Sequence, residues 1–166
     1  ENTKQYQIII TLGGVSKGNY DLVRKHYRKL GIKILVDGLP IKPGKPLIIG
    51  KLDSKIIFCL PGNPISSIVC SKLFIVALIK KMLGEKLDSI TTRKALLSED
   101  IEIPISQREH YMRAFTFQKG TTIYVKPFSR QDSSLHSVLI KSNCLLIIPP
   151  CSSPLKKGSI AEIIDF

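Results

Sequence analysis

Apolar positions in the first half of the chain follow the pattern of an α/β domain. Residues 7–11 form a β-branched run, which predicts a strand buried on both faces. A helix is predicted from about residue 20 to 30, followed by a strand at 34–36. Its apolar stripe is expected to consist of Leu22, Val23, Tyr27 and Leu30. A strand, a helix and a strand with short connections predict a parallel βαβ unit.

The next segment predicts a hairpin and then a long helix. The hairpin is indicated by two apolar runs around a polar turn, residues 47–49 and 55–59. Asn63 is the expected N-cap of the helix, with Pro64 at its first position and Gly84 at its end. Residues 73–79 are apolar nearly all round, so we expect this helix to be buried or to lie at a subunit interface.

After about residue 87, helical periodicity gives way to short strand-like runs separated by turn residues. Their spacing predicts a small β-barrel or sandwich. The runs are residues 101–103, 111–117, 121–125, 144–148 and 159–164. We therefore predict two domains, residues 1–87 and residues 88–166, with a linker at 85–88.

A formal net charge of +12 is the unusual feature of this 166-residue composition. It favours anionic partners such as nucleic acid, acidic membranes, nucleotides or oxyanions. The basic residues are spread along the chain, which favours a role in solubility over non-specific nucleic-acid binding. The apolar stretch 65–83 is broken by serines and lysines and is too short to cross a bilayer. We expect neither a nucleic-acid nor a membrane partner.

The cysteines and histidines indicate a cytoplasmic protein without a zinc cage. Cys59 and Cys70 sit in apolar contexts typical of buried free thiols, and no Cys-x-x-Cys pair occurs. The three histidines lie far apart, without zinc-site spacing. The chain begins at Glu1 without a signal peptide and almost directly on a strand, so we expect a fragment of a longer protein.

Segment 13–21, which reads GGVSKGNYD, joins the first strand to a helix start. Its glycines, Gly13 and Gly14, let the backbone approach a ligand, and the helix start offers free amides and a positive dipole end. Asp21 either complements that dipole, which contributes about 0.3–1 kcal/mol, or holds a metal ion that bridges to a phosphate.

Segment 42–46, which reads KPGKP, places Lys42 and Lys45 in one proline-braced turn. Two ammonium groups at roughly 6 Å repel by about 3 kcal/mol at an effective dielectric of about 20, unless an anion lies between them. The pair therefore predicts an anion site. The alternative is two solvated lysines that point apart.

Segment 60–66, which reads LPGNPIS, is a second strand–turn–helix junction. Ser66 falls in the first helical turn, where a hydroxyl and backbone amides make an oxyanion cradle with Gly62 and Asn63. The alternative is ordinary capping by Asn63, with Ser66 and Ser67 as exposed residues.

In the β region, Arg113 lies on a strand that alternates Tyr111, Arg113, Phe115 and Phe117. Its guanidinium either reaches solvent or points into a cleft as an anion ligand. The polar loop 131–134 precedes a predicted short helix, and Ser134 either caps this helix or binds ligand.

These motifs, in this order and followed by a β region, resemble the molybdopterin molybdotransferases, which comprise the bacterial MoeA type and the E domain of gephyrin. The family pattern is approximately GGVS-x-G-x-x-D, KPGKP and LPGNP-V/I-S. Arg108, Asn143 and the 131–134 loop resemble its C-terminal domain. The resemblance implies the latter part of a MogA-like, three-layer α/β domain that binds molybdopterin, followed by a small β-barrel domain.

The resemblance also implies an activity: insertion of molybdate into adenylylated molybdopterin with release of AMP, assisted by magnesium, in a cytoplasmic homodimer. The implied molybdate contacts are Lys42, Lys45 and Ser66, faced by Arg113, and the implied metal ligand is Asp21. The implied pterin or phosphate contacts are Gly13, Gly14, Ser16, Gly62, Asn63 and Ser134.

The chain departs from the family pattern in several places. Family members have two further N-terminal domains, and Leu12 stands where serine is usual. Leu135 and Val138 stand where the family often has arginine and serine. The alternative function is therefore a non-catalytic ligand-binding or dimerisation remnant. The sequence does not separate molybdate from tungstate, because both are tetrahedral oxyanions of similar size.

Overall fold

The structure, a computed structural model, describes residues 5–15, 20–86, 90–129, 131 and 136–166. It divides the chain into two compact units. The first consists of Glu1–Leu39 with Gly44–Ser71, and the second of Pro40–Pro43 with Lys72–Phe166. Residues 87–89 lie outside the described residues, so the domain boundary between residues 87 and 88 stays a prediction.

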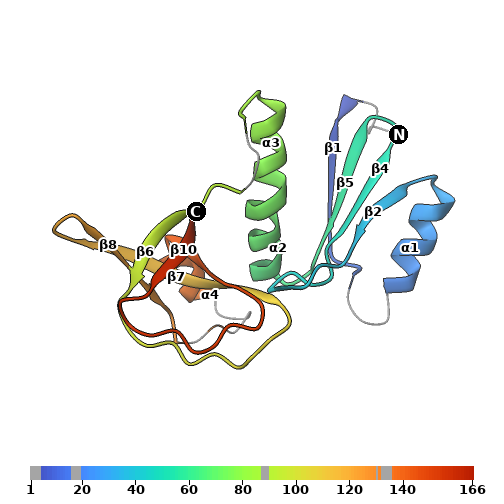
Figure 1. The fold of residues 1–166 in the computed structure, drawn as a ribbon. Coiled ribbons are helices and arrows are strands. Elements are labelled where there is room, and N and C mark those ends of the chain that lie inside the picture. The colour runs from blue at the N-terminus through green and yellow to red at the C-terminus, as the bar shows by residue number, and fades with distance from the viewer. Residues whose placement is uncertain (1–4, 16–19, 87–89, 130, 132–135) are drawn as a thin grey trace. The chain divides into compact units, whose positions relative to one another are not determined.

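The first unit is built on a four-stranded mixed sheet of order β1-β5-β4-β2 (Figure 1). The strands are β1 (Ile8–Leu12), β2 (Lys33–Asp37), β4 (Ile48–Leu52) and β5 (Lys55–Leu60). β1 is parallel to β5, whereas the β5–β4 and β4–β2 pairs are antiparallel. β1 and β2 therefore run in the same direction with α1 (Tyr20–Lys29) between them in sequence, as predicted. The predicted hairpin, β4–β5, lies between them in the sheet.

The prediction that the first strand is buried on both faces is wrong. β1 is an edge strand, and Ile10 and Leu12 are 48% and 72% exposed. Because side chains alternate along a strand, Ile9 packs on the opposite face, against the core. That core consists of Val15, Tyr27, Ile32, Ile48, Ile57 and Cys59, with Val23 packed against it. Leu30, expected in the apolar stripe of α1, is 64% exposed.

The predicted long helix is present, but it is not uniform. It consists of α2 (Pro64–Cys70), a π-helical turn at Ser71–Ile75 and α3 (Val76–Met82). The π-turn has no signal in the sequence. Leu73 is buried, whereas Ile79 is 43% exposed, so the expectation of burial holds for only part of the helix. Gly84, at φ 89°, follows its end as predicted.

The second unit is a closed β-barrel (Figure 1). Around the barrel the order is β7-β8-β6-β10-β9, and β9 closes it on β7. The strands are β6 (Arg93–Leu97), β7 (Glu109–Lys119), β8 (Thr122–Pro127), β9 (Cys144–Ile148) and β10 (Ile160–Asp165). The short β3 (Ile41–Lys42) pairs in parallel with the start of β7. The predicted short helix is α4 (His136–Lys141).

One barrel strand was assigned to the wrong segment. Residues 101–103 form no strand, and Ile101 makes only an isolated bridge with Leu155. The strand is β6, which begins with two exposed basic residues and therefore lacks an apolar alternation. Its pairing with β8 and β10 makes it a strand. The barrel interior is filled by buried Leu97, Ile101, Ala114, Val125, Cys144, Leu146, Ile148 and Ile163, with Ala95 and Ala161.

The cysteines are free thiols, and Cys59 and Cys70 are buried as predicted; Cys144 is buried as well. Burial raises the pKa of the Cys70 and Cys144 thiols to about 12. Cys151 is exposed. Among the described residues, no helix is long and apolar enough to cross a membrane.

Candidate functional site

The start of the first motif, at Gly13, lies beside the third motif in the first unit. They follow β1 and β5, whose carboxyl ends share one edge of the sheet because the strands are parallel. The Gly13 N–H donates to the Leu60 carbonyl at 3.0 Å. A methyl group on Gly62 would lie 3.4 Å from the Gly13 Cα, so the loops pack backbone against backbone. Gly13 and Gly14 have φ values of 84° and 76°, which favour glycine.

Asn63 caps α2, as predicted. Its Oδ1 accepts from the Ser66 N–H at 3.1 Å and from the Ser66 hydroxyl at 3.4 Å. Ser66 and Ser67 are each 8% exposed, so the alternative in which both are exposed is wrong on that point. A hydroxyl has one hydrogen, and Ser66 can donate it to an anion only by giving up its contact with Asn63.

The Ser67 hydroxyl is used inside the turn. It donates to the Pro61 carbonyl and lies 3.1 Å from the Asn63 carbonyl oxygen. The Ser67 N–H also donates to the Asn63 carbonyl, at 3.0 Å. These hydrogen bonds stabilise the turn before α2. The Ser67 hydroxyl contacts two backbone carbonyls, whereas the Ser66 hydroxyl contacts the Asn63 side chain.

The two lysines of the second motif belong to different units. Lys42 lies on β3 opposite His110 of β7, in the second unit. Lys45 lies in the first unit, in a turn that the Leu47 N–H closes onto the Gly44 carbonyl at 3.1 Å. Both lysine side chains are exposed. The Lys42–Pro43 peptide is cis. That the two ammonium groups lie close together stays a prediction.

The Lys45 turn lies against α2. The Cys70 Sγ contacts the Gly44 carbonyl oxygen at 3.8 Å. Residues four apart lie on the same face of a helix, so Cys70 shares a face with Ser66. The turn that carries Lys45 therefore flanks the face of α2 that carries Ser66.

Arg113 is buried in the barrel wall, with 2% of its surface exposed. The alternative in which it reaches solvent is therefore wrong. Its backbone N–H and its Nε–H donate to Gln131 Oε1, at 3.0 and 3.4 Å. The predicted aromatic face is present, since the Phe115 and Phe117 ring centroids lie 5.9 Å apart.

The start of β7 adds further polar groups beside Arg113. The Tyr111 hydroxyl donates to Glu109 Oε1, and burial followed by this contact raises the pKa of Tyr111. His110, on the opposite face of the strand, is 9% exposed. Burial lowers its pKa from 6.5, and the positive charges of Lys42 and Arg108 lower it further. His110 is therefore neutral at pH 7.

Because the pKa of His110 is lower in the folded than in the unfolded chain, stability should fall as the pH drops. Below pH 6.5 the unfolded state binds the additional proton, so acid favours unfolding. We expect wild type to lose more unfolding free energy between pH 7.5 and 5.0 than a His110→Gln variant. Urea unfolding at both pH values measures this difference. Equal losses in the two proteins would contradict the lowered pKa.

Three candidates cannot be placed in full. Asp21 lies in the first turn of α1, but its side chain is outside the described part of the chain. Ser16 and Ser134 lie outside the described residues. Within those residues, no three His, Cys, Asp or Glu side chains come together as a metal site.

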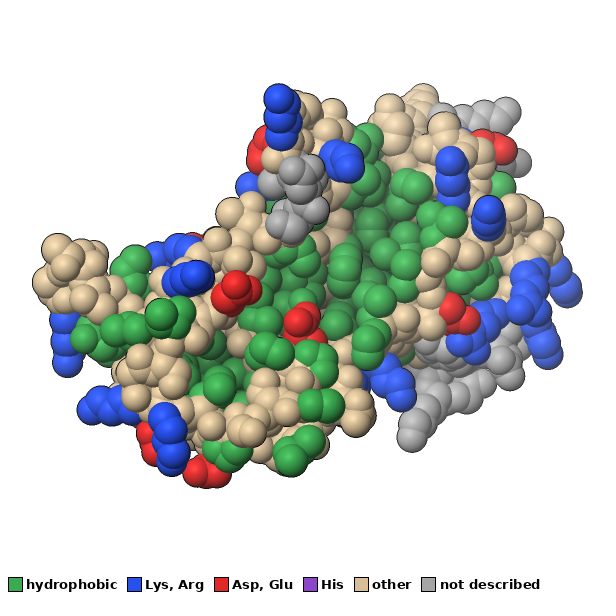
Figure 2. Space-filling view, viewed as in Figure 1, with side chains coloured by type: hydrophobic (Ala, Val, Ile, Leu, Met, Phe, Trp, Pro, Cys, Tyr) green, Lys and Arg blue, Asp and Glu red, His purple; other side chains and the backbone are tan. Residues whose placement is uncertain are grey.

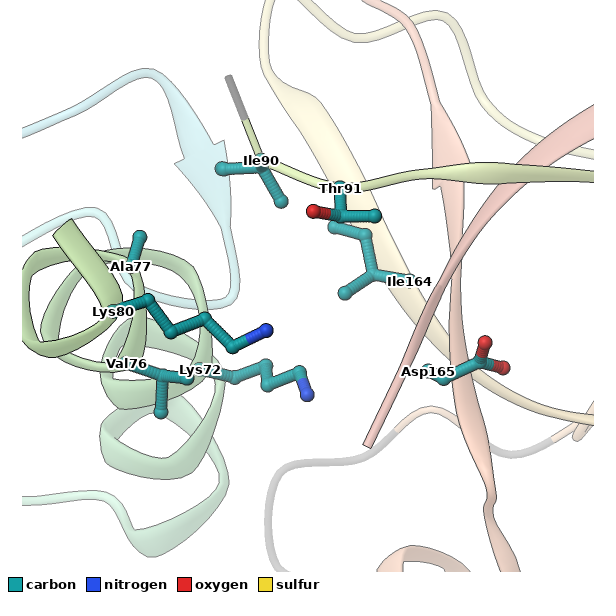
Figure 3. A pocket seen from close by; sticks show the side chains of 8 residues that line it. All are labelled: Lys72, Val76, Ala77, Lys80, Ile90, Thr91, Ile164 and Asp165. Atoms are coloured by element: carbon teal, nitrogen blue, oxygen red, sulfur yellow. The ribbon is translucent and has the colours of Figure 1, made fainter. Parts of the chain in front are cut away.

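A cavity of about 180 Å³ lies in the second unit, and none of its lining residues is a predicted site residue (Figure 3). Its walls are Lys72, Val76, Ala77, Lys80, Ile90, Thr91, Ile164 and Asp165. Lys80 pairs with Glu85 at 3.6 Å, and Arg93 binds the Asp165 carboxylate through two contacts of 2.5 and 2.6 Å. On the face seen in Figure 2, lysines and arginines are scattered rather than gathered in one patch.

Reasoning from the sequence missed the roles of Glu109 and Gln131. Gln131 is the first residue of the polar loop 131–134, but its contacts are with the Arg113 carbonyl, which is distant in sequence, and with the Phe128 carbonyl, which follows no regular sequence pattern. Glu109 lies two residues before Tyr111 on the same strand face, and that spacing was the available signal.

Comparisons with known proteins match two consecutive families. Residues 1–81 match the family described as a probable molybdopterin binding domain, and residues 95–166 match the MoeA C-terminal region (domain IV). The molybdopterin molybdenumtransferase of Haemophilus influenzae is 28% identical over 98% of this chain and 40% of its own length. That of Bacillus subtilis is 25% identical over 99% of this chain and 38% of its own length.

Solved structures from two Pyrococcus species have a similar fold. A molybdopterin biosynthesis MoeA protein from Pyrococcus horikoshii has a TM-score of 0.68 at 25% identity, over 95% of this chain and 36% of that one. A molybdenum cofactor biosynthesis protein from Pyrococcus furiosus has a TM-score of 0.61 at 19% identity, over 91% of this chain and 55% of that one. The chain spans about 40% of the length of its curated relatives.

Proposed function

Since the chain belongs to the MoeA family, with a molybdopterin-binding domain followed by the MoeA C-terminal region, we propose that it binds molybdate for insertion into adenylylated molybdopterin. As part of a longer chain, it would act as a molybdopterin molybdotransferase that releases AMP. We place this chemistry in a cytoplasmic homodimer. The curated relatives that carry the enzyme name support a role in molybdenum cofactor biosynthesis.

The observation that carries the proposal is the neighbourhood of Ser66 in the first unit. The Lys45 turn flanks the Ser66 face of α2, through the contact between Cys70 and Gly44. The exposed backbone of Gly62 and the Gly13 loop pack together at the same helix start. A cationic side chain, a hydroxyl donor and a glycine backbone that a ligand can approach closely are groups that bind tetrahedral oxyanions.

The protein's contribution would be electrostatic. Lys42 and Lys45 balance the charge of the dianion, Ser66 donates a hydrogen bond, and Arg113 offers a planar guanidinium from the barrel. No protein nucleophile is required, because the dithiolene sulfurs of molybdopterin replace molybdate oxygens. Gly13, Gly14, Ser16, Asn63 and Ser134 are the proposed contacts of the pterin or phosphate.

Asp21 is the proposed ligand of a magnesium ion. Mg²⁺ is usually held by one or two carboxylates together with substrate phosphate oxygens, and a single aspartate at a helix start fits that donor set. When bound, the ion would neutralise phosphate charge.

Titration of the chain with sodium molybdate in a calorimeter tests the proposal. We expect saturable binding, and we expect Ser66→Ala to weaken it by about tenfold or more, since a hydrogen bond to a charged group contributes about 1.5–3 kcal/mol. Ser67→Ala is the matched control. Its hydroxyl serves the turn, so this variant should lose stability but keep its affinity. A folded wild-type chain that gives no heat with molybdate would overturn the proposal.

A non-catalytic remnant that binds ligand or dimerises is the second candidate. It is favoured by the exposed apolar residues of the β1 edge, Ile10 and Leu12, which are suited to a partner surface. In the same titration, a folded chain that does not bind molybdate would favour this second candidate.

A further inference from the structure

The side-chain amide of Gln131 makes four hydrogen bonds around Arg113. Its Oε1 accepts from the Arg113 backbone N–H at 3.0 Å and from Arg113 Nε–H at 3.4 Å. Its Nε2 donates to the Arg113 carbonyl at 3.0 Å and to the Phe128 carbonyl at 2.7 Å. The oxygen meets only donors and the nitrogen only acceptors, so the contacts fix the orientation of the amide.

This amide ties a turn to the strand that carries Arg113. The Arg113 carbonyl accepts a second bond, from the Phe128 N–H at 3.1 Å, so both of its lone pairs are used. The chain after β8 is thereby folded back onto β7 at Arg113. Arg113 is 2% exposed, and its backbone and Nε are held by the same side chain.

A second amide makes the same kind of contact on β7, but without an arginine. Asn143 Oδ1 accepts from the Thr116 N–H at 2.8 Å, and its Nδ2 donates to the Thr116 carbonyl at 3.3 Å. Thr116 lies three residues beyond Arg113 on the same strand. Asn143 therefore binds the backbone of β7 in the same way while holding no cationic side chain, which makes it the natural reference for Gln131.

We propose that Gln131 is the positioning residue of Arg113: it fixes the orientation of the guanidinium before an oxyanion arrives. This role rests on the proposed function, in which Arg113 faces molybdate. A long, flexible arginine loses side-chain freedom when it binds an anion, and a contact that has already removed this freedom raises the affinity. Gln131 acts through Arg113 and does not itself touch the anion.

The test compares Gln131→Met with Asn143→Leu in the complete 166-residue chain. Each variant replaces a side-chain amide that is hydrogen-bonded to β7 by an apolar side chain of similar size. We expect both to lower the melting temperature. Only Gln131→Met should raise the molybdate Kd, by about tenfold or more, because Arg113 then loses its fixed orientation. Gln131→Glu is the second variant, in case Gln131→Met does not fold. It keeps both acceptor contacts, but its carboxylate neutralises the guanidinium, and it should weaken binding as well.

The NMR signal of Arg113 Nε–H provides a readout that needs no ligand. In wild type we expect a resolved signal that exchanges slowly with water, because the group is buried and bonded; in Gln131→Met it should be lost. If Gln131 were only structural, Gln131→Met and Asn143→Leu would behave alike, with an unchanged Kd, and that result would overturn the positioning role. Absence of molybdate binding in wild type would instead overturn the proposed function, while the Nε–H signal still reports whether Gln131 holds Arg113.

Discussion

Replacing Lys42 and Lys45 together by alanine is expected to weaken molybdate binding by a hundredfold or more. Each ammonium group would make a charge-assisted contact of about 1.5–3 kcal/mol with the dianion, and the two losses add to several kcal/mol. Stability should change little, because both side chains are exposed. The measurement is the calorimetric titration with molybdate, together with thermal unfolding of the same preparation.

The matched control is the pair Lys33→Ala and Lys51→Ala. These lysines are also exposed and are paired across β2 and β4, so the double variant removes the same net charge from the chain. It should bind molybdate within about twofold of wild type, since surface charge acts only weakly through screened solvent. If both double variants lost affinity equally, molybdate binding would depend on the overall positive charge of the chain and not on a site at Lys42 and Lys45.

Ile163→Ala is expected to destabilise the barrel by about 3–4 kcal/mol, a large share of the stability of an ordinary domain. Ile163 is fully buried on β10, opposite Leu146 of β9, and it belongs to the cluster that fills the interior. Truncation leaves a cavity in the barrel interior. The strands cannot move inward to fill it, because each is hydrogen-bonded to a neighbour on both sides. Urea unfolding followed by circular dichroism measures the change.

Ile160→Ala on the same strand is the comparison. Ile160 is 67% exposed, so the same chemical truncation should cost less than about 0.5 kcal/mol. If Ile163 lies in the barrel core and Ile160 does not, the losses of unfolding free energy in the two variants must differ clearly. Similar losses would mean that Ile163 is not in a close-packed interior.

The sequence predicted those elements whose signals are local. Asn63 and Pro64 mark the start of α2, and Gly84 follows the end of α3, because capping and backbone conformation involve only neighbouring residues. The hairpin of β4 and β5 was predicted from its turn for the same reason. Local signals also located the Gly13 and Gly62 loops, which the fold then brings together.

Features that depend on distant neighbours were missed. β6 starts with Arg93 and Lys94 and becomes a strand only through its partners β8 and β10. The β-branched run of β1 indicated burial on both faces, whereas burial depends on whether a neighbour covers the strand. For the site, the sequence indicated Arg113 but not its burial or its contact with Gln131, since both depend on residues that are distant in sequence.

The placement of residues 40–43 has a consequence for how this molecule can be divided. These residues belong to the barrel unit, although the sequence on both sides of them belongs to the first unit. A gene cut after residue 71 would give a barrel piece without β3, and the Glu109 N–H would lose its bond to the Pro40 carbonyl at 2.9 Å. The two units are therefore interleaved rather than modular. A recombinant that replaced only residues 72–166 would keep its original β3, with Lys42, paired with the β7 of another relative.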